Sequence, residues 1–127
     1  MNKIIATKSA PDAIGPYSQA VEISCTNLVF LSGQIPLDPK TMEIVGSNAK
    51  EQCQQVMKNL LEVLKEAGCT FGNLVKTTIY LKNMSDFAVV NDVYSAYFSE
   101  NPPARATVAV SELPKNVLVE IDGVASK

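Results

Sequence analysis

The segment from Asn48 to Ala67 constrains the fold of this chain more than any other feature. Its apolar residues recur at intervals of three and four, which places them on one face of a helix. These residues are Ala49, Cys53, Val56, Met57, Leu60, Leu61, Leu64 and Ala67. Asn48 followed by Glu51 resembles a capping box, and Gly68 is placed to end the helix in the left-handed conformation. The pattern therefore predicts one long amphipathic helix with one buried face.

Strand-like segments lie on both sides of this helix. KIIAT, IGPYSQAVEI and LVFLSGQI precede it, and LVKTTIYL follows it after the turn sequence FGN. A second amphipathic helix is opened by Ser85 or Asp86 and is ended by ENPP. Its apolar residues are Phe87, Val90, Tyr94, Tyr97 and Phe98. ARATVAV and VLVEIDGVA are two further strands, so we expect an α+β fold with a single sheet and both helices on one of its faces.

The sheet face that the helices leave uncovered also carries apolar residues. In VLVEIDGVA, Val119 and Ile121 share one face, whereas Leu118 and Val124 share the other. A solvated sheet face would instead be polar. We therefore expect copies of the chain to pack over this face as a homo-oligomer, with ligand sites at the clefts between subunits.

Length and composition limit the possible classes of protein. A chain of 127 residues suits one domain, spanning residues 1–127, and has no apolar run long enough to cross a bilayer. The 11 basic residues are scattered among 13 acidic ones, so the net charge of −2 gives no footprint for nucleic acid or a membrane surface. Cys25, Cys53 and Cys69 form no C-x-x-C pair, which is typical of reduced thiols in a cytoplasmic protein.

The chain contains no histidine. Ser-His-Asp and Cys-His nucleophilic sites are therefore excluded, and so is any metal site built on imidazole. Catalysis by this chain would have to use carboxylate, arginine, tyrosine, backbone or water.

Charged residues stand in two of the predicted strands. Arg105 and Thr107 share one side of ARATVAV, and Glu120 and Asp122 share one side of VLVEIDGVA. Arg105 could be a solvated residue or one partner of a structural ion pair. It could also be held free to bind the carboxylate of a ligand, which its planar guanidinium can grip with two parallel hydrogen bonds.

Three other positions have both a structural and a functional interpretation. Tyr17 follows a Gly-Pro turn, where a tyrosine is more often a packed anchor than a catalytic group. Gly33, in SGQ, would let the backbone approach another group closely. Asn91 lies within the apolar stripe of the second helix, where its amide needs hydrogen-bond partners, most simply a neighbouring backbone group.

Six segments resemble the RidA family of reactive intermediate deaminases, also called YjgF-type or L-PSP proteins. They are IGPYSQAV, LSGQIPLDP, VKTTIYL, DFAVVNDVY, PPARATV and LPKNVLVEI, in this order from about residue 5 to residue 124. The resemblance implies a chorismate-mutase-like α+β fold assembled as a homotrimer with three clefts between subunits. It also implies hydrolysis of 2-iminobutanoate and 2-iminopropanoate to 2-oxo acids and ammonia, a reaction for which we expect neither a metal nor a cofactor.

The resemblance further implies a role for particular residues. Arg105 would grip the substrate carboxylate, Glu120 would hold or activate the attacking water, and Tyr17 would contact the substrate and help to fix that water. The other positions that match the family's pocket are Ser32, Gly33, Asn91 and Thr107, some of them from a neighbouring subunit. Many relatives have cysteine at position 107, so the threonine here implies that a thiol is not essential. The stretch between Phe98 and Arg105 is shorter than in several bacterial members, which alters the rim of the pocket.

Two other functions are compatible with the same residues. The trimer could bind 2-oxo acids or other small carboxylates through Arg105 and regulate a partner without turnover. An endoribonuclease or translation inhibitor is the other alternative, as in some family members. The negative net charge and the absence of histidine argue against it, because RNA cleavage usually needs cationic phosphate contacts and an acid–base pair.

Overall fold

The computed structural model describes residues 2–127, and the predicted segments all form elements of the expected type. The strands and helices are β1 (Asn2–Ile5), β2 (Ala20–Ile23), β3 (Leu28–Gln34), α1 (Ala49–Glu66), β4 (Leu74–Leu81), α2 (Phe87–Ser95), β5 (Ala104–Ala109) and β6 (Val119–Ser126). Short 3-10 turns span Phe71–Asn73, Met84–Asp86 and Pro114–Asn116. No helix among these residues is both long enough and apolar enough to span a bilayer.

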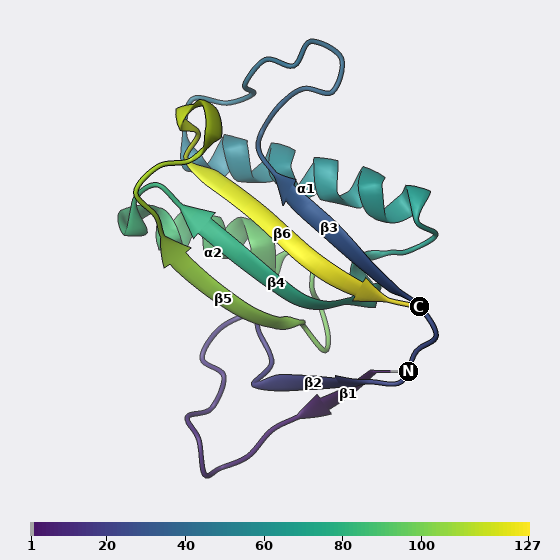
Figure 1. The fold of residues 1–127 in the computed structure, drawn as a ribbon. Helices are drawn as coiled ribbons and strands as arrows, with labels where there is room; N and C mark the ends of the chain where they lie inside the picture. Colours follow the sequence, from purple (N-terminus) through teal and green to yellow (C-terminus); the bar gives the residue numbers. More distant parts are fainter. Residues whose placement is uncertain (1) are drawn as a thin grey trace.

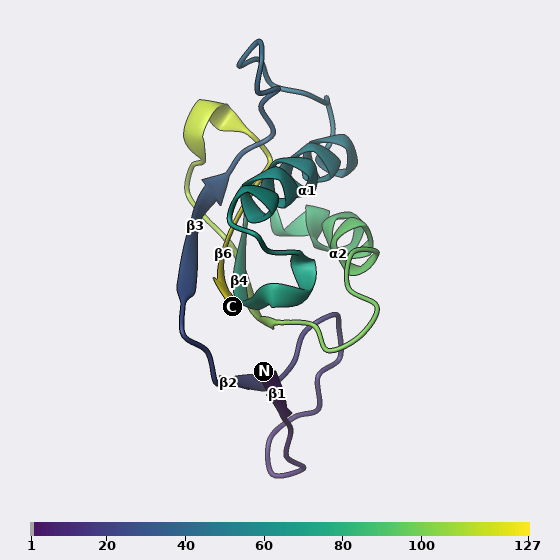
Figure 2. The same ribbon diagram turned by 90° about the vertical axis from the view of Figure 1, so that its right-hand side faces the viewer.

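Four of the strands form a mixed sheet in the order β3-β6-β4-β5 (Figure 1). β6 runs antiparallel to both β3 and β4, whereas β4 and β5 are parallel and are connected through α2. Both helices lie on one face of this sheet, and Figure 2 shows them together on the same side. The predicted α+β fold with two helices on one sheet face is therefore confirmed.

The expectation of a single sheet was wrong. β1 and β2 pair only with each other, as an antiparallel ladder below the four-stranded sheet (Figure 1). The chain before β2 is attached to the start of β5, because Ser18 forms a parallel bridge with Ala104 and its N–H donates to the Pro103 carbonyl at 3.1 Å. These contacts hold the β1–β2 ladder at the β5 end of the sheet and leave β3 as an edge strand.

The long helix begins and ends as its sequence predicts. Asn48 is the N-cap, and its side-chain oxygen accepts from the Glu51 N–H at 2.9 Å. The Glu51 carboxylate accepts from the Ser47 N–H rather than from that of Asn48, so only half of the expected capping box forms. Gly68 has a φ of +75°, the left-handed conformation that favours glycine at a helix end.

The second helix is shorter than its apolar stripe indicated. α2 ends at Ser95, and Tyr97 and Phe98 lie beyond it. Both rings pack on Phe71, whose ring centroid lies 5.1 Å from that of Tyr97 and 5.7 Å from that of Phe98. These aromatic contacts explain the apolar residues after Ser95 without a longer helix.

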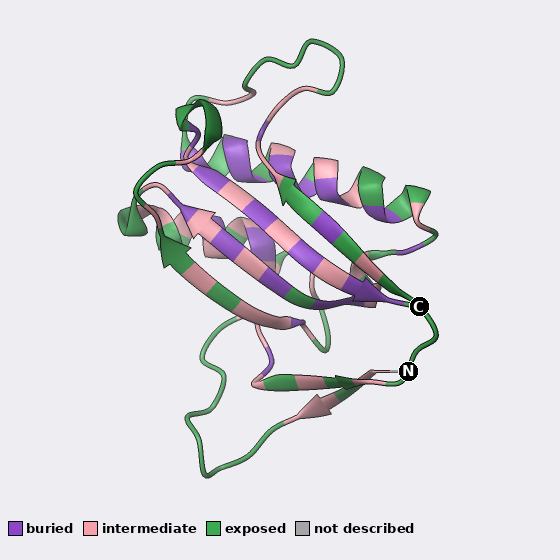
Figure 3. Cartoon of the chain, viewed as in Figure 1, coloured by how far each residue is buried: buried purple, intermediate pink, exposed green. Residues whose placement is uncertain are grey.

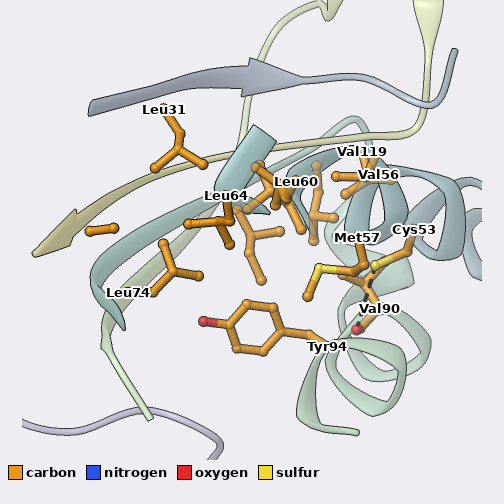
Figure 4. Close-up of a cluster of buried hydrophobic side chains, with 14 of the residues drawn as sticks. Leu31, Cys53, Val56, Met57, Leu60, Leu64, Leu74, Val90, Tyr94 and Val119 are labelled. Carbon is orange, nitrogen blue, oxygen red and sulfur yellow. Dashed lines mark hydrogen bonds between the residues drawn. The ribbon is translucent and has the colours of Figure 1, made fainter. Parts of the chain in front are cut away.

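The core lies between the helices and the sheet. The residues buried there are shown in purple in Figure 3, and Figure 4 shows how α1 side chains such as Met57, Leu60 and Leu64 meet Tyr94 of α2 and Val119 of β6. The alternation along β4 follows from this packing, since Thr77, Ile79 and Leu81 face the helices and are buried.

The opposite face of the sheet is uncovered and carries apolar residues, as the sequence predicted. Phe30 of β3 is 74% exposed and Val108 of β5 is 41% exposed. Val124 is half-buried and pairs directly with Phe30 across the β3–β6 ladder. Leu118, just before β6, is half-buried and packs against the buried core cluster instead. Apolar side chains of this size on one open sheet face mark a surface suited to packing against another protein surface.

Met42 lies in the turn between β3 and α1 with a φ of +61°, which is unfavourable for a residue with a β-carbon. Its side chain is 59% exposed, so few contacts offset this strain. Replacing Met42 by glycine should raise the free energy of unfolding by about 1 kcal/mol, because the relief of strain exceeds the added entropy of the unfolded chain. Urea unfolding should show a higher midpoint at an unchanged m-value.

Candidate active site

Arg105 lies on the helix side of the sheet, at the second position of the edge strand β5. It pairs in parallel register with Thr77, which is buried beneath the helices. The side chain is half-buried, and its Nη1 donates a 2.7 Å hydrogen bond to Oδ1 of Asn91 in α2. The sequence favoured a bond from the Asn91 amide to a neighbouring backbone group. The amide oxygen instead accepts from the Arg105 guanidinium.

Three aromatic rings surround the Arg105 guanidinium. Its central carbon lies 5.5 Å from the ring centroid of Tyr17, 5.9 Å from that of Phe87 and 5.2 Å from that of Tyr94. Aromatic faces at these distances attract a cation. Burial lowers the pKa of Arg105, but guanidinium remains charged in proteins. The rings therefore hold a cation in a fixed orientation.

The Arg105 cation has no carboxylate partner among residues 2–127. The ion pairs in this part of the chain are Lys8–Asp12 and Lys65–Glu62, both on the surface. Within the same residues, Asn91 is its one side-chain hydrogen-bond acceptor. The guanidinium carries several further N–H donors in a planar fork, so it keeps donors for a ligand.

Tyr94 joins the Arg105 group to the core. Its ring lies among the buried apolar side chains (Figure 4), and burial raises its pKa to about 12. Its hydroxyl shares a 2.7 Å hydrogen bond with Oγ1 of Thr77, which is 1% exposed. This buried bond fixes the ring below the guanidinium.

Replacing Tyr94 by phenylalanine should lower the free energy of unfolding by about 1–3 kcal/mol, because the buried Thr77 hydroxyl loses its partner. Chemical denaturation measures this loss. The double variant Tyr94→Phe/Thr77→Val should recover much of it, since neither buried polar group then remains. A double variant no more stable than Tyr94→Phe would show that the hydrogen bond is not the cause.

Thr107 lies two residues after Arg105 on the same side of β5. Its hydroxyl oxygen is buried and has no hydrogen-bond partner within residues 2–127. A buried hydroxyl without a partner is costly, and such groups are usually satisfied by water or a ligand. Thr107 therefore offers a second polar group beside the guanidinium.

Glu120 lies on the opposite face of the sheet from Arg105. It pairs with Tyr80 of β4, and both side chains alternate with residues buried under the helices. A β-carbon at Gly33 of β3 would clash with the Glu120 carboxylate and lie 2.8 Å from its Cδ. The glycine thus makes room for the Glu120 carboxylate. Partial burial, and then the charge of Asp122, raise the pKa of Glu120.

The seven candidate residues thus form two groups in one chain. Arg105, Tyr17, Asn91 and Thr107 lie around the start of β5 on the helix side. Glu120 and Gly33 lie on the uncovered face, and Ser32 is exposed beside Gly33 in the irregular part of the β3–β6 ladder. β4 separates β5 from β6, so the two groups do not meet within one copy of the chain.

Two hollows lie among the described residues. One of 340 Å³ is lined by Asn2, Cys25, Asn73 and neighbouring residues near the chain ends, and one of 320 Å³ lies between Met42 and Val63. Neither is lined by Arg105 or Glu120. In a single copy, therefore, neither hollow can serve as an enclosed site for these two residues.

Sequence reasoning placed Phe87, Asn91 and Tyr94 in one stripe of the second helix and named Asn91 as a candidate, but it did not assign Phe87 or Tyr94 to the surroundings of Arg105. Their spacing from Asn91 could have placed both rings there. Tyr80 and Asp122 gave no comparable signal, because their contact depends on the register between β4 and β6.

Comparison with known proteins gives a consistent family assignment. Residues 7–127 match the family model described as endoribonuclease L-PSP. The mouse protein named 2-iminobutanoate/2-iminopropanoate deaminase is 47% identical over 125 residues, which covers 98% of this chain and 91% of the mouse protein.

Two solved structures extend the comparison. RidA from an Antarctic Psychrobacter bacterium is 42% identical, with a TM-score of 0.76 over 98% of this chain and 99% of that one. Escherichia coli TdcF, solved with bound serine, is 38% identical, with a TM-score of 0.75 over 98% of both chains.

Proposed function

Because this chain belongs to the endoribonuclease L-PSP family, which includes RidA, we propose that it hydrolyses 2-iminobutanoate and 2-iminopropanoate to 2-oxo acids and ammonia. The observation that carries the proposal is the Arg105 guanidinium, which is half-buried, oriented by three aromatic rings and without a carboxylate partner among residues 2–127. Its planar fork matches the carboxylate that these substrates share. The name of the mouse relative supports this choice of substrate.

The active site in this proposal forms between copies of the chain in a homotrimer. Arg105 and Glu120 lie on opposite faces of one sheet, so a substrate that touches both needs Arg105 from one copy and Glu120 from the next. An interface between two different surfaces closes into a ring when its rotation allows, and three copies make such a ring. Phe30, Val108 and the rest of the uncovered face would be buried in it.

Water is the nucleophile in the proposed reaction. Arg105 holds the substrate carboxylate while Glu120 accepts a proton from water, whose oxygen attacks the imine carbon. The proton then passes from Glu120 to the nitrogen of the adduct. Glu120 accepts the proton of the adduct's hydroxyl as the carbon–nitrogen bond breaks, so ammonia leaves and the carbonyl forms. A protonated imine is already electrophilic, so orientation and one acid–base group suffice, and histidine is not needed.

The other candidate residues have supporting roles. The Tyr17 ring lies beside the guanidinium, and its hydroxyl, which accepts from the Ile14 N–H at 3.4 Å, would contact the substrate and help to fix the water. The unpartnered Thr107 hydroxyl would bond to a polar atom of the substrate. Asn91 acts through Arg105 by fixing its Nη1, and Gly33 leaves space for the Glu120 carboxylate.

Imine trapping tests the activity directly. A serine/threonine dehydratase generates 2-aminoacrylate or 2-iminobutanoate in situ, and semicarbazide captures the free imine. Addition of this protein should reduce the captured imine in proportion to its concentration, and the 2-oxo acid should form faster. Equal capture with and without the protein, at several protein concentrations, would refute the activity.

A regulatory carboxylate binder is the second candidate function. TdcF, a relative of 38% identity, was solved with bound serine, an amino acid that carries a carboxylate. Saturable binding of 2-oxobutanoate that depends on Arg105, together with no acceleration of imine hydrolysis, would favour this function over the deaminase.

Endoribonuclease activity, which the family description mentions, suits this chain less well. A net charge of −2 and the absence of histidine provide neither an attractive field for RNA nor the usual acid–base residue.

A further inference from the structure

The surroundings of Glu120 contain a hydrogen bond that the proposed reaction does not use. Tyr80 lies directly opposite Glu120 in the β4–β6 ladder, where side chains are close neighbours. Its hydroxyl nevertheless donates to Oδ2 of Asp122 at 2.9 Å, two positions further along β6. The hydroxyl of the residue opposite Glu120 is therefore bound to Asp122 and not to Glu120.

No residue among 2–127 donates a hydrogen bond to the Glu120 carboxylate. Gly33 approaches it from β3 without a β-carbon, and Tyr80 flanks it from β4 with its hydroxyl turned away. The carboxylate thus has free acceptor positions on the uncovered sheet face.

We propose that Asp122 is a positioning residue for Glu120: it binds the Tyr80 hydroxyl and so keeps the Glu120 carboxylate free to hold the attacking water. This inference rests on the proposed function, since it assigns a role to a neighbour of the proposed base. A tyrosine hydroxyl donating to Glu120 would occupy an acceptor position and stabilise the charged form, which would make Glu120 a weaker base.

The negative charge of Asp122 also makes Glu120 a stronger base. It raises the pKa of Glu120, in addition to the larger effect of burial. The other titratable groups on this face come from β4 and the residue after it: Tyr80 is bound to Asp122, Lys76 shares its face of the strand, and Lys82 directly follows the strand. β3 contributes no ionisable side chain, and Arg105 of β5 lies on the other face.

Three variants separate the hydrogen bond from the charge. In Asp122→Asn the amide oxygen still accepts from Tyr80, so kcat should change little while the acidic limb of the pH–rate profile moves to lower pH. In Asp122→Ala the Tyr80 hydroxyl is released toward Glu120, and kcat at the pH optimum should fall on the order of 10-fold. Asp122→Ala/Tyr80→Phe removes that hydroxyl and should restore kcat to the level of Asp122→Asn.

Rescue by the second substitution is the deciding result, because a loss caused by misfolding or poor packing would not be repaired by removing one more oxygen. An Asp122→Ala/Tyr80→Phe protein no more active than Asp122→Ala would overturn the proposal. An Asp122→Ala protein with full activity would overturn it as well.

A carboxyl titration followed by NMR keeps this inference distinct from the deaminase proposal. In protein labelled with ¹³C at glutamate side chains, the Glu120 midpoint should lie at lower pH in Asp122→Ala, where the Tyr80 hydroxyl can donate to Glu120, than in Asp122→Ala/Tyr80→Phe, whether or not imine is hydrolysed. Equal midpoints in these two variants would contradict the inference even if the wild type is active. Failure of imine trapping with midpoints that differ as expected would refute only the deaminase.

Discussion

Replacing Arg105 by alanine should reduce kcat/KM for imine hydrolysis on the order of 10²–10³-fold, because the substrate carboxylate loses a charged, doubly hydrogen-bonded partner. Arg105→Lys should recover only a small part of this loss. An ammonium keeps the charge but has no planar fork, and the aromatic rings and Asn91 are arranged around a guanidinium. The measurement is steady-state kinetics with imine generated by a dehydratase.

Binding of 2-oxobutanoate provides the second readout for the same variants. Calorimetric binding should be lost in Arg105→Ala and weakened in Arg105→Lys. Lys58→Ala is a matched control, since it removes an exposed cation from the outer face of α1 and should leave both kinetics and binding unchanged. Full activity in Arg105→Ala, with the protein folded, would refute the role of Arg105 as the carboxylate ligand.

Replacing Glu120 by glutamine should lower kcat on the order of 10²–10⁴-fold, the range that a general base contributes, while binding of 2-oxobutanoate stays within a few-fold of the wild type. Glutamine has the shape of glutamate and fits the space beside Gly33, but it cannot accept a proton from water. The result expected is therefore a loss in turnover rather than in affinity.

The pH dependence of wild-type activity also tests the role of Glu120 as the base. Glu120 must be ionised to accept a proton, so activity should fall as the pH drops through its pKa. Burial and the Asp122 charge raise that pKa, and the acidic limb should lie above the range of an ordinary glutamate. Glu62→Gln, at an exposed carboxylate of α1, is the matched control. A Glu120→Gln enzyme with an unchanged rate and profile would contradict the role.

Much of the fold could be predicted from the sequence because it depends on local patterns. The apolar period of α1, its Asn48 cap and the left-handed Gly68 are signals within one segment, and β4 was predicted at its observed bounds. The β1–β2 ladder was misplaced because its position depends on contacts between Ser18 and residues 102–104, far apart in sequence. A contact between segments so far apart leaves no periodic pattern in the sequence.

The sequence named candidate residues but not their arrangement in space. Arg105 and Glu120 were placed in strands correctly, yet the sequence could not show that β4 lies between those strands and that the two side chains face opposite sides. The aromatic rings around Arg105 come from a loop and from α2. Their convergence is a property of tertiary packing.

The most direct test of the account is complementation between two inactive variants. Arg105→Ala and Glu120→Gln subunits are unfolded together at equal concentration, refolded and assayed for imine hydrolysis, with each variant refolded alone as the control. If each site takes Arg105 from one copy and Glu120 from the next, random assembly leaves about one quarter of the sites with both native residues. The mixture should then recover about one quarter of wild-type activity. Activity in the mixture no higher than the average of the two variants alone would contradict a site shared between copies.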